Sequence, residues 1–235
     1  MFTTHEVVSP SKVDEQGNLK LFSATQMMQD CSQLWLDSEP FAARFFRENN
    51  RAQLLVSRQI DIIRVPRYGE KLSITTSIFE FKELYGFRNT VIRDEAGHPC
   101  YVTWSMGAFI SLETNKLAKL PQELLDSITI DEKYPMEYVD RKIRIPAGES
   151  TTFEEIHPRK DDIDFNHHIN NAQYMRMAME YLPEDFLPVR IRIEYKNPVR
   201  MGDVITPALQ SIDGGYLFTL KNGTTLCCVI EFKNK

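Results

Sequence analysis

Apolar and polar residues alternate in long runs of this sequence, and other stretches place apolar residues at helical spacing. Residues 71–84 and 85–112 show the alternation of half-buried strands, with a hairpin turn expected at residues 94–97. Helical spacing occurs in residues 23–36, 39–52, 120–128 and 172–182. A helix followed by several strands, twice over, predicts an α+β fold in which each helix packs on one face of an antiparallel sheet.

The two halves of the chain resemble each other. Residues 3–12, TTHEVVSPSK, agree with residues 151–160, TTFEEIHPRK, at half of the positions. Residues 23–36 then lie opposite 170–183, and a later segment aligns Gly69 with Gly202 and Glu70 with Asp203. Three similar segments in the same order indicate a duplication. We therefore predict a first repeat over 1–130, a connecting linker over 131–150 and a second repeat over 151–235.

A dense polar run precedes the helix expected at residues 172–182. Asn170 or Asn171 can serve as the N-cap of this helix, and Pro183 ends it. A helix N-terminus offers unpaired N–H groups where negative charge develops on an oxygen. An alternative is that the run only makes turns and caps the helix, although imidazole does neither. The run contains Asp161, Asp162, Asp164, Asn166, His167, His168, Asn170 and Asn171.

The first half differs from the second at the polar run. Three first-half residues align with the carboxylate, the amide and the imidazole of the polar run, and none of these first-half residues has an ionisable side chain. This difference predicts one active copy and one structural copy. In this register Gly17, Leu19 and Leu21 stand opposite Asp164, Asn166 and His168.

Composition narrows the functional classes. Apolar residues make up 42%, charged residues 26%, and the formal net charge is −5, which argues against a nucleic-acid binder. The four cysteines have no metal-ligand spacing, and no apolar run reaches the ~18 residues of a membrane span. There is no G-x-S-x-G, H-E-x-x-H or Gly-rich phosphate loop. We expect a cytoplasmic protein without a metal or cofactor.

The pattern D-x-D-x-N-x-H-x-N-N-x-x-Y, followed by Glu180 and Pro183, resembles the active-site signature of the acyl-acyl carrier protein (acyl-ACP) thioesterases of plants and bacteria. The resemblance implies a tandem, or double, hotdog fold, in which each half is a central helix wrapped by an antiparallel β-sheet. It also implies a thioester hydrolase that releases free fatty acid from fatty acyl-ACP in fatty acid biosynthesis. Apolar side chains of the first, structural repeat would then line a tunnel or cleft for the acyl chain; the candidates are Met27, Met28, Leu34, Trp35, Phe79 and Phe81.

The same resemblance assigns roles within the polar run. Asp164 would attack the thioester or activate water, and Asn166 and His168 would position and polarise the reacting groups. Asn170 and Asn171 would support the oxyanion at the helix start. In this sequence Pro198 stands near the second catalytic glutamate of the plant enzymes, so Glu194, four residues earlier, is the candidate second carboxylate.

Acyl carrier protein is strongly acidic, so the resemblance implies a basic docking face. Hydrolysis of acyl-coenzyme A on the same fold is an alternative, and so is a non-catalytic protein that binds acyl chains. Because the double unit pairs two hotdog repeats within one chain, we expect a monomer or a homodimer. The candidate docking residues are Arg141, Lys142, Arg144, Arg159 and Lys160.

Overall fold

The structure, a computed structural model, describes residues 1–82, 84–114 and 116–234. Its first compact unit comprises Met1–Val56 and Ile63–Tyr138, and its second comprises Ser57–Ile62 and Val139–Lys235. The end of β2 (Arg51–Ile62) belongs to the second unit because it pairs there with β8 (Arg190–Tyr195). The sequence division at residue 130 did not anticipate this pairing between distant segments.

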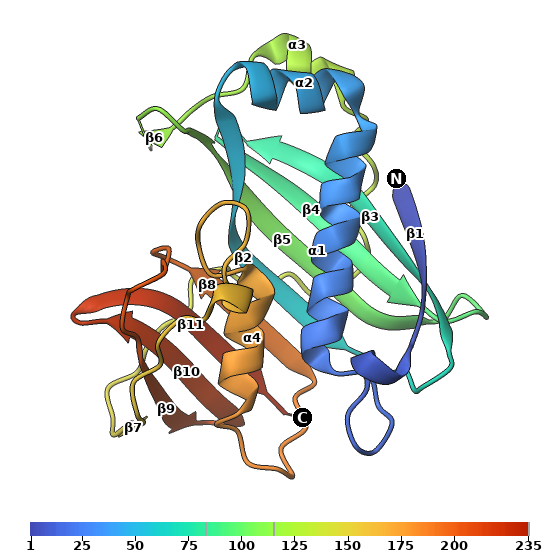
Figure 1. The fold of residues 1–235 in the computed structure, drawn as a ribbon. Helices are drawn as coiled ribbons and strands as arrows, with labels where there is room; N and C mark the ends of the chain where they lie inside the picture. The colour runs from blue at the N-terminus through green and yellow to red at the C-terminus, as the bar shows by residue number, and fades with distance from the viewer. Residues whose placement is uncertain (83, 115, 235) are drawn as a thin grey trace. The chain divides into compact units, whose positions relative to one another are not determined.

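The sheet of the first unit places its strands in the order β1-β3-β4-β5-β2 (Figure 1). Alternate residues of β3 are buried, as expected for a strand with one face on the core. The expected hairpin is confirmed: Asp94 N donates to His98 O at 3.0 Å, and Gly97 adopts φ +85° between β4 and β5. The remaining strands are β1 (Phe2–Val7), β3 (Lys71–Lys82), β4 (Tyr85–Arg93), β5 (Pro99–Ser111) and the short β6 (Lys116–Leu117), which pairs with β5.

Helix α1 (Leu21–Ser38) lies across one face of this sheet (Figure 1). Its residues Ala24, Met28 and Cys31 are fully buried at helical spacing and pack on the sheet. The two short helices predicted from the sequence are also present, as α2 (Pro40–Glu48) and α3 (Gln122–Ser127).

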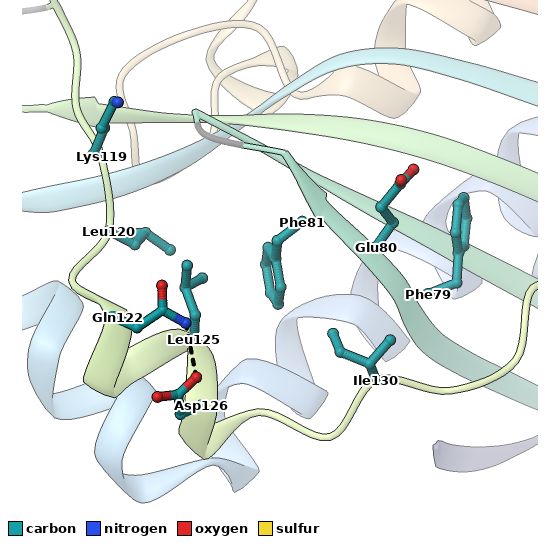
Figure 2. A pocket seen from close by; sticks show the side chains of 9 residues that line it. All are labelled: Phe79, Glu80, Phe81, Lys119, Leu120, Gln122, Leu125, Asp126 and Ile130. Atoms are coloured by element: carbon teal, nitrogen blue, oxygen red, sulfur yellow. Dashed lines mark hydrogen bonds between the residues drawn. The ribbon is translucent and has the colours of Figure 1, made fainter.

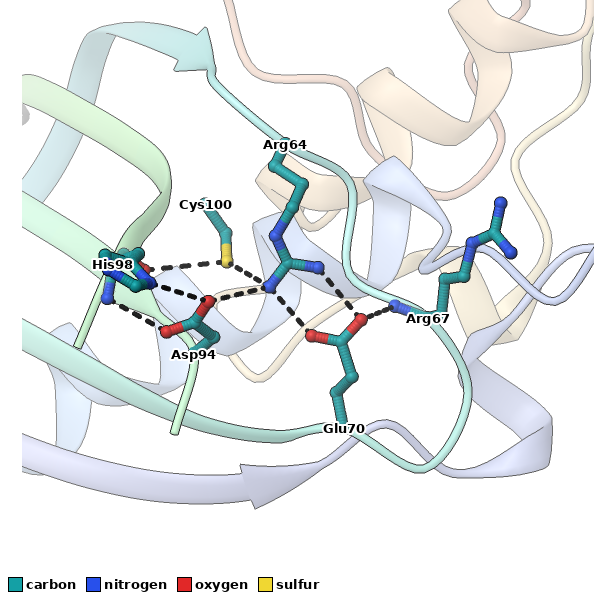
Figure 3. Close-up of polar contacts among 6 residues, drawn as sticks. All are labelled: Arg64, Arg67, Glu70, Asp94, His98 and Cys100. Atoms are coloured by element: carbon teal, nitrogen blue, oxygen red, sulfur yellow. Dashed lines mark hydrogen bonds and ion pairs between the residues drawn. The ribbon is translucent and has the colours of Figure 1, made fainter. Parts of the chain in front are cut away.

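An ion-pair network ties the loop after β2 to the β4–β5 hairpin (Figure 3). Arg64 donates to both carboxylate oxygens of Glu70, at 2.9 and 2.8 Å, and to Asp94 Oδ2 at 3.1 Å. The hydrogen bonds from Arg64 lower the pKa of Glu70 below its ordinary value. The network therefore fixes the turn that enters β3.

The connection between the repeats packs on sheet faces. Asn89 Oδ1 accepts hydrogen bonds from Tyr134 N and Tyr138 Oη, both at 3.0 Å, on the face of the first sheet opposite α1. In the second unit Ile143 is buried in a cluster with Leu217 and Val229. The predicted linker is thus held against each sheet at a few points, and Ile143 is its one buried residue.

The second unit repeats the plan with fewer elements. Its strand order is β2-β8-β11-β10-β9-β7, and α4 (Asn171–Met179) covers one face (Figure 1). The strand–turn match predicted from the sequence is confirmed: Glu70 accepts from Arg67 N and Asp203 accepts from Arg200 N, each at 2.7 Å. The strands not yet defined are β7 (Thr151–Thr152), β9 (Thr206–Ile212), β10 (Gly215–Asn222) and β11 (Thr225–Lys233).

Among the described residues, no helix combines the length and the apolar character needed to cross a bilayer.

Candidate active site

The polar loop before α4 is shaped by its own aspartate. Oδ1 of Asp164 accepts the N–H of Asn166 at 2.8 Å, Asp164 N donates to His168 O at 2.9 Å, and His167 N donates to Asp164 O at 2.9 Å. A bridge between Ile163 and Ile169 closes the base of the turn. Asp164, Asn166 and His168 are therefore brought together in one tight turn.

The first unit contains the same turn directly before α1. Oδ1 of Asp14 accepts the N–H groups of Gln16 and Asn18, at 3.0 and 2.8 Å, and Asp14 N donates to Asn18 O at 2.9 Å. A bridge between Val13 and Leu19 closes it. The sequence register opposite the polar run was therefore wrong. The structural counterparts of Asp164, Asn166 and His168 are Asp14, Gln16 and Asn18, and not Gly17, Leu19 and Leu21.

The register error has a simple physical cause. Helix α1 begins at Leu21 and α4 at Asn171, which is a slip of about one helical turn from the sequence alignment. Such a slip still superimposes apolar positions, because they recur every three or four residues. The two copies therefore differ less than predicted. Both keep the aspartate that forms the turn, and only the second has a histidine two residues before the N-cap.

His167 occupies a strained position in this turn. Its φ is +62°, where the first unit has Gly17 at φ +78°. A side chain in the left-handed region costs roughly 1–2 kcal/mol, and strain of this kind is typical of functional loops. We expect His167→Gly to leave the melting temperature unchanged or raise it by up to about 3 °C. His167→Val should lower it in the same circular dichroism melts. Equal melting of the two variants would show that the turn does not impose this conformation.

A buried ion pair anchors the base of the loop. Asp162, at the end of the short 3-10 helix η2 (Lys160–Asp162), is 5% exposed. Its carboxylate accepts from Arg159 N at 2.8 Å and from Arg176 Nη2 of α4 at 2.9 Å. Sequence reasoning missed Arg176, because no local spacing links it to a residue in another element.

The start of α4 is capped as predicted. Asn170 is the N-cap, and its Oδ1 accepts the N–H of Ala172 at 2.9 Å. Asn171 is the first helical residue, and its carbonyl accepts the hydroxyl of Tyr195 at 3.2 Å. The helix start, with its partial positive charge, therefore adjoins the turn that holds His168.

His168 is half-buried, and burial lowers its pKa below the ordinary 6.5. The positive charge of Arg200 and the neighbouring His167 lower it further, whereas the carboxylate of Asp164 opposes them. The imidazole is therefore neutral at pH 7 and can donate or accept a hydrogen bond. A carboxylate, an amide and a neutral imidazole at a helix start can activate water and stabilise an oxyanion.

Glu194 is not brought together with the loop. On β8 it faces away from its neighbour Tyr195, whose hydroxyl reaches α4. Its carboxylate, 3% exposed as a residue, instead accepts from Lys196 Nζ at 2.7 Å and from Ile143 N, with Arg141 Nη1 at 4.0 Å. The structure thus places Glu194 under the linker, on the face opposite α4.

The candidate docking residues are all exposed and fall into two groups. Arg159 and Lys160 belong to η2 and its N-cap, directly before the loop. Arg141, Lys142 and Arg144 flank Ile143, which packs on the opposite face of the sheet. The structure therefore does not bring the five cations together.

The first unit contains a cavity of about 610 Å³ between β3 and α3 (Figure 2). Of the six apolar residues expected to line an acyl pocket, Phe79 and Phe81 line this cavity. Met27, Met28, Leu34 and Trp35 are not among its described lining residues. The other lining residues are Glu80, Lys119, Leu120, Gln122, Leu125, Asp126 and Ile130.

Among the described residues, no three His, Cys, Asp or Glu side chains gather as a metal site requires.

The family models and the curated relatives that match this chain point to the same protein family. Residues 1–128 match the family model of the acyl-ACP thioesterase N-terminal domain, and residues 146–229 match that of the C-terminal domain. The acyl-[acyl-carrier-protein] hydrolase FATB1, chloroplastic, of Cuphea viscosissima is 25% identical over 198 residues, covering 76% of this chain and 47% of that protein. The dodecanoyl-[acyl-carrier-protein] hydrolase of Cinnamomum camphora is 25% identical over 172 residues, covering 66% of this chain and 43% of that protein. The chain thus spans less than half the length of these relatives.

Solved structures show the same fold. An acyl-ACP thioesterase from Bacteroides thetaiotaomicron superimposes with a TM-score of 0.88 at 22% identity, covering 98% of this chain and 96% of that one. The 12:0-ACP thioesterase from Umbellularia californica gives a TM-score of 0.83 at 14% identity, with coverages of 99% and 96%. The predicted double hotdog fold is confirmed.

Proposed function

Because this chain belongs to the acyl-ACP thioesterase family, we propose that it hydrolyses fatty acyl-ACP to free fatty acid and carrier protein in fatty acid biosynthesis. The observation that carries the proposal is the turn that gathers Asp164, Asn166 and His168 at the start of α4. The relatives named as acyl-ACP hydrolases support it.

The chemistry centres on the free oxygen of Asp164. Its Oδ1 is engaged by Asn166 N, and no described residue donates to Oδ2. Oδ2 takes a proton from water as the water oxygen attacks the acyl carbon, or it attacks that carbon itself and water then cleaves the anhydride. In both routes the C–S bond breaks and the carrier thiol leaves with a proton.

The oxyanion formed at the acyl carbon needs hydrogen-bond donors. The neutral imidazole of His168, the amide of Asn166 and the N–H of Asn171 at the start of α4 supply them. The carboxylate of Glu194 accepts hydrogen bonds from Lys196 and from Ile143 of the linker, so Asp164 is the carboxylate that acts in this site. The proposal thus uses one carboxylate, consistent with Pro198 near the position expected for the second.

The pH profile should report His168. Since its pKa lies below 6.5, we expect kcat/KM to be constant near pH 7 and to fall on the acid side as the imidazole is protonated. Arg200→Ala removes a charge that lowers this pKa, so the acid limb should move to higher pH. If the acid limb of the kcat/KM profile of Arg200→Ala lies at the same pH as that of wild type in the same buffers, the titrating group is not His168.

We place carrier docking on Arg159 and Lys160, because these exposed cations precede the loop and the expected partner is acidic. Arg141→Ala and Lys142→Ala are matched controls on the opposite face. A rise in KM for acyl-ACP that is confined to the alanine variants of Arg159 and Lys160 supports this assignment.

A monomeric or homodimeric state and a cytoplasmic location stay predictions. The curated relatives are named as chloroplast proteins.

The decisive experiment measures thiol release from a panel of acyl-ACPs and the matching acyl-coenzyme A esters. The proposal predicts turnover of acyl-ACP that is lost in His168→Ala, with circular dichroism unchanged. Turnover of coenzyme A esters alone would make the protein an acyl-CoA thioesterase. Binding of acyl chains without turnover of either series would make it a non-catalytic acyl binder.

A further inference from the structure

Arg58 of β2 is a buried cation for which no described residue supplies a counterion. The residue is 5% exposed, and its Nε and Nη1 atoms have no hydrogen-bond partner among the described residues. Burial lowers the pKa of its guanidinium. An unpaired ion in a protein interior costs several kcal/mol, so such groups are rare unless a ligand satisfies them.

The strand register places Arg58 on the face that α4 covers. Arg58 pairs with Ile193 across β2 and β8, so its side chain shares a face with Ile193 and Tyr195. Tyr195 donates to the first helical residue, Asn171, and its ring packs edge-on against Tyr174 of α4 at 5.6 Å. The charge of Arg58 lowers the pKa of Tyr195, against the upward effect of burial. The guanidinium thus lies near Tyr195, which contacts the first turn of α4.

The acidic residues on these strands lie on the opposite face. Asp61, Glu194 and Glu231 alternate away from α4, and each already pairs with a cation there. Their partners are Arg190, Lys196 and Arg192, with atoms 2.7 to 2.9 Å apart. The side chains around Arg58 on the α4 face are apolar or aromatic, and include Ile60, Ile191, Ile193, Tyr195 and Cys228.

A lone cation in apolar surroundings, beside a tyrosine that bonds to the first residue of a helix, suits an oxygen that carries or gains negative charge at the end of an apolar chain. We propose that Arg58 binds the substrate at its acyl carbon, donating hydrogen bonds to the thioester carbonyl oxygen and, after hydrolysis, to the carboxylate of the released fatty acid. This inference rests on the proposed thioesterase function for the first of these two contacts.

The first test is binding of the free product. We expect wild-type protein to bind saturated fatty acids about tenfold more tightly than the matching primary alcohols in calorimetry, the margin of one charge-assisted hydrogen bond. In Arg58→Met the two ligand series should bind equally. Arg58→Lys should keep part of the preference, because it keeps the charge but loses the planar geometry.

Stability separates a binding role from a structural one. Removing an unpaired buried charge in favour of an apolar side chain of similar length should leave the melting temperature of ligand-free Arg58→Met equal to or above that of wild type. A marked fall would show that Arg58 is satisfied within the protein and would overturn the proposal. Arg192→Met is the matched control, because it removes a paired arginine from the opposite face of β8. It should keep the preference for acids.

Kinetics complete the test. In acyl-ACP hydrolysis, kcat/KM of Arg58→Met should fall by about 10²-fold, as for loss of one oxyanion donor. Hydrolysis by wild type together with an unchanged acid-to-alcohol ratio in Arg58→Met would overturn the Arg58 assignment and leave the thioesterase function standing. If wild type did not hydrolyse acyl-ACP but preferred acids in a way that depends on Arg58, the thioesterase function would be overturned and the Arg58 assignment would stand.

Discussion

Asp164→Asn is expected to lower kcat for acyl-ACP hydrolysis by about 10³-fold while leaving the fold intact. The asparagine oxygen can still accept the N–H of Asn166, so the turn persists and only the reactive carboxylate is lost. Single-turnover thiol release measures the chemical step, and circular dichroism melts verify the fold.

The first unit offers a matched control for this substitution. Asp14 forms the equivalent turn, in which its Oδ1 accepts the N–H of Gln16, as Asp164 accepts that of Asn166, and also the N–H of Asn18. Asp14→Asn therefore makes the same chemical change in an equivalent backbone. We expect it to leave kcat within about twofold of wild type. Equal losses in both variants would mean that the aspartate acts through loop structure, and would remove the catalytic role of Asp164.

Asp162→Ala is expected to lower the free energy of unfolding by about 3 kcal/mol, the lower end for breaking a buried ion pair. The lower end applies because the side chain of Asp162 is 6% exposed whereas that of Arg176 is 39% exposed, so the arginine regains water. The variant also loses the acceptor of Arg159 N. Urea denaturation monitored by fluorescence measures the change.

Two further variants test the origin of this loss. Asp162→Asn keeps an acceptor for Arg159 N and should lose about half as much. Asp161→Ala changes the exposed neighbouring carboxylate and should stay within about 0.5 kcal/mol of wild type. A similar loss in Asp161→Ala would point to general weakening of the loop instead of the buried pair.

Local patterns predicted the fold well, because they are set by residues close in sequence. The hairpin at Asp94–Gly97 follows from turn chemistry between alternating strands, and the cap at Asn170 follows from its place before an apolar helix. The alignment of the two helices failed because helical periodicity tolerates a slip of one turn. Aligning the two aspartates that can form a turn, Asp14 and Asp164, would have given the correct register, since each accepts the N–H two residues later.

Features set by pairing between distant strands escaped sequence analysis. Arg58 and Arg192 both look like ordinary polar positions of alternating strands. The β2–β8 register turns Arg58 to the buried face, where no described residue accepts from its Nε or Nη1. Glu194 lies close to Pro198 in sequence, yet strand alternation turns it to the far face of the sheet. The division of the basic residues between two faces has the same origin.

The turn shared by the two units bears on how such a protein evolves. One carboxylate and the main chain fix the shape of the loop, so selection can act on the remaining side chains without risk to folding. After a duplication, one loop can drift while the other keeps its chemistry, and the drifting loop stays a stable scaffold. The first unit preserves such a scaffold: Gln16→Asn would shorten its amide side chain to that of Asn166, and Asn18→His would supply the imidazole, on a backbone that already has the required turn.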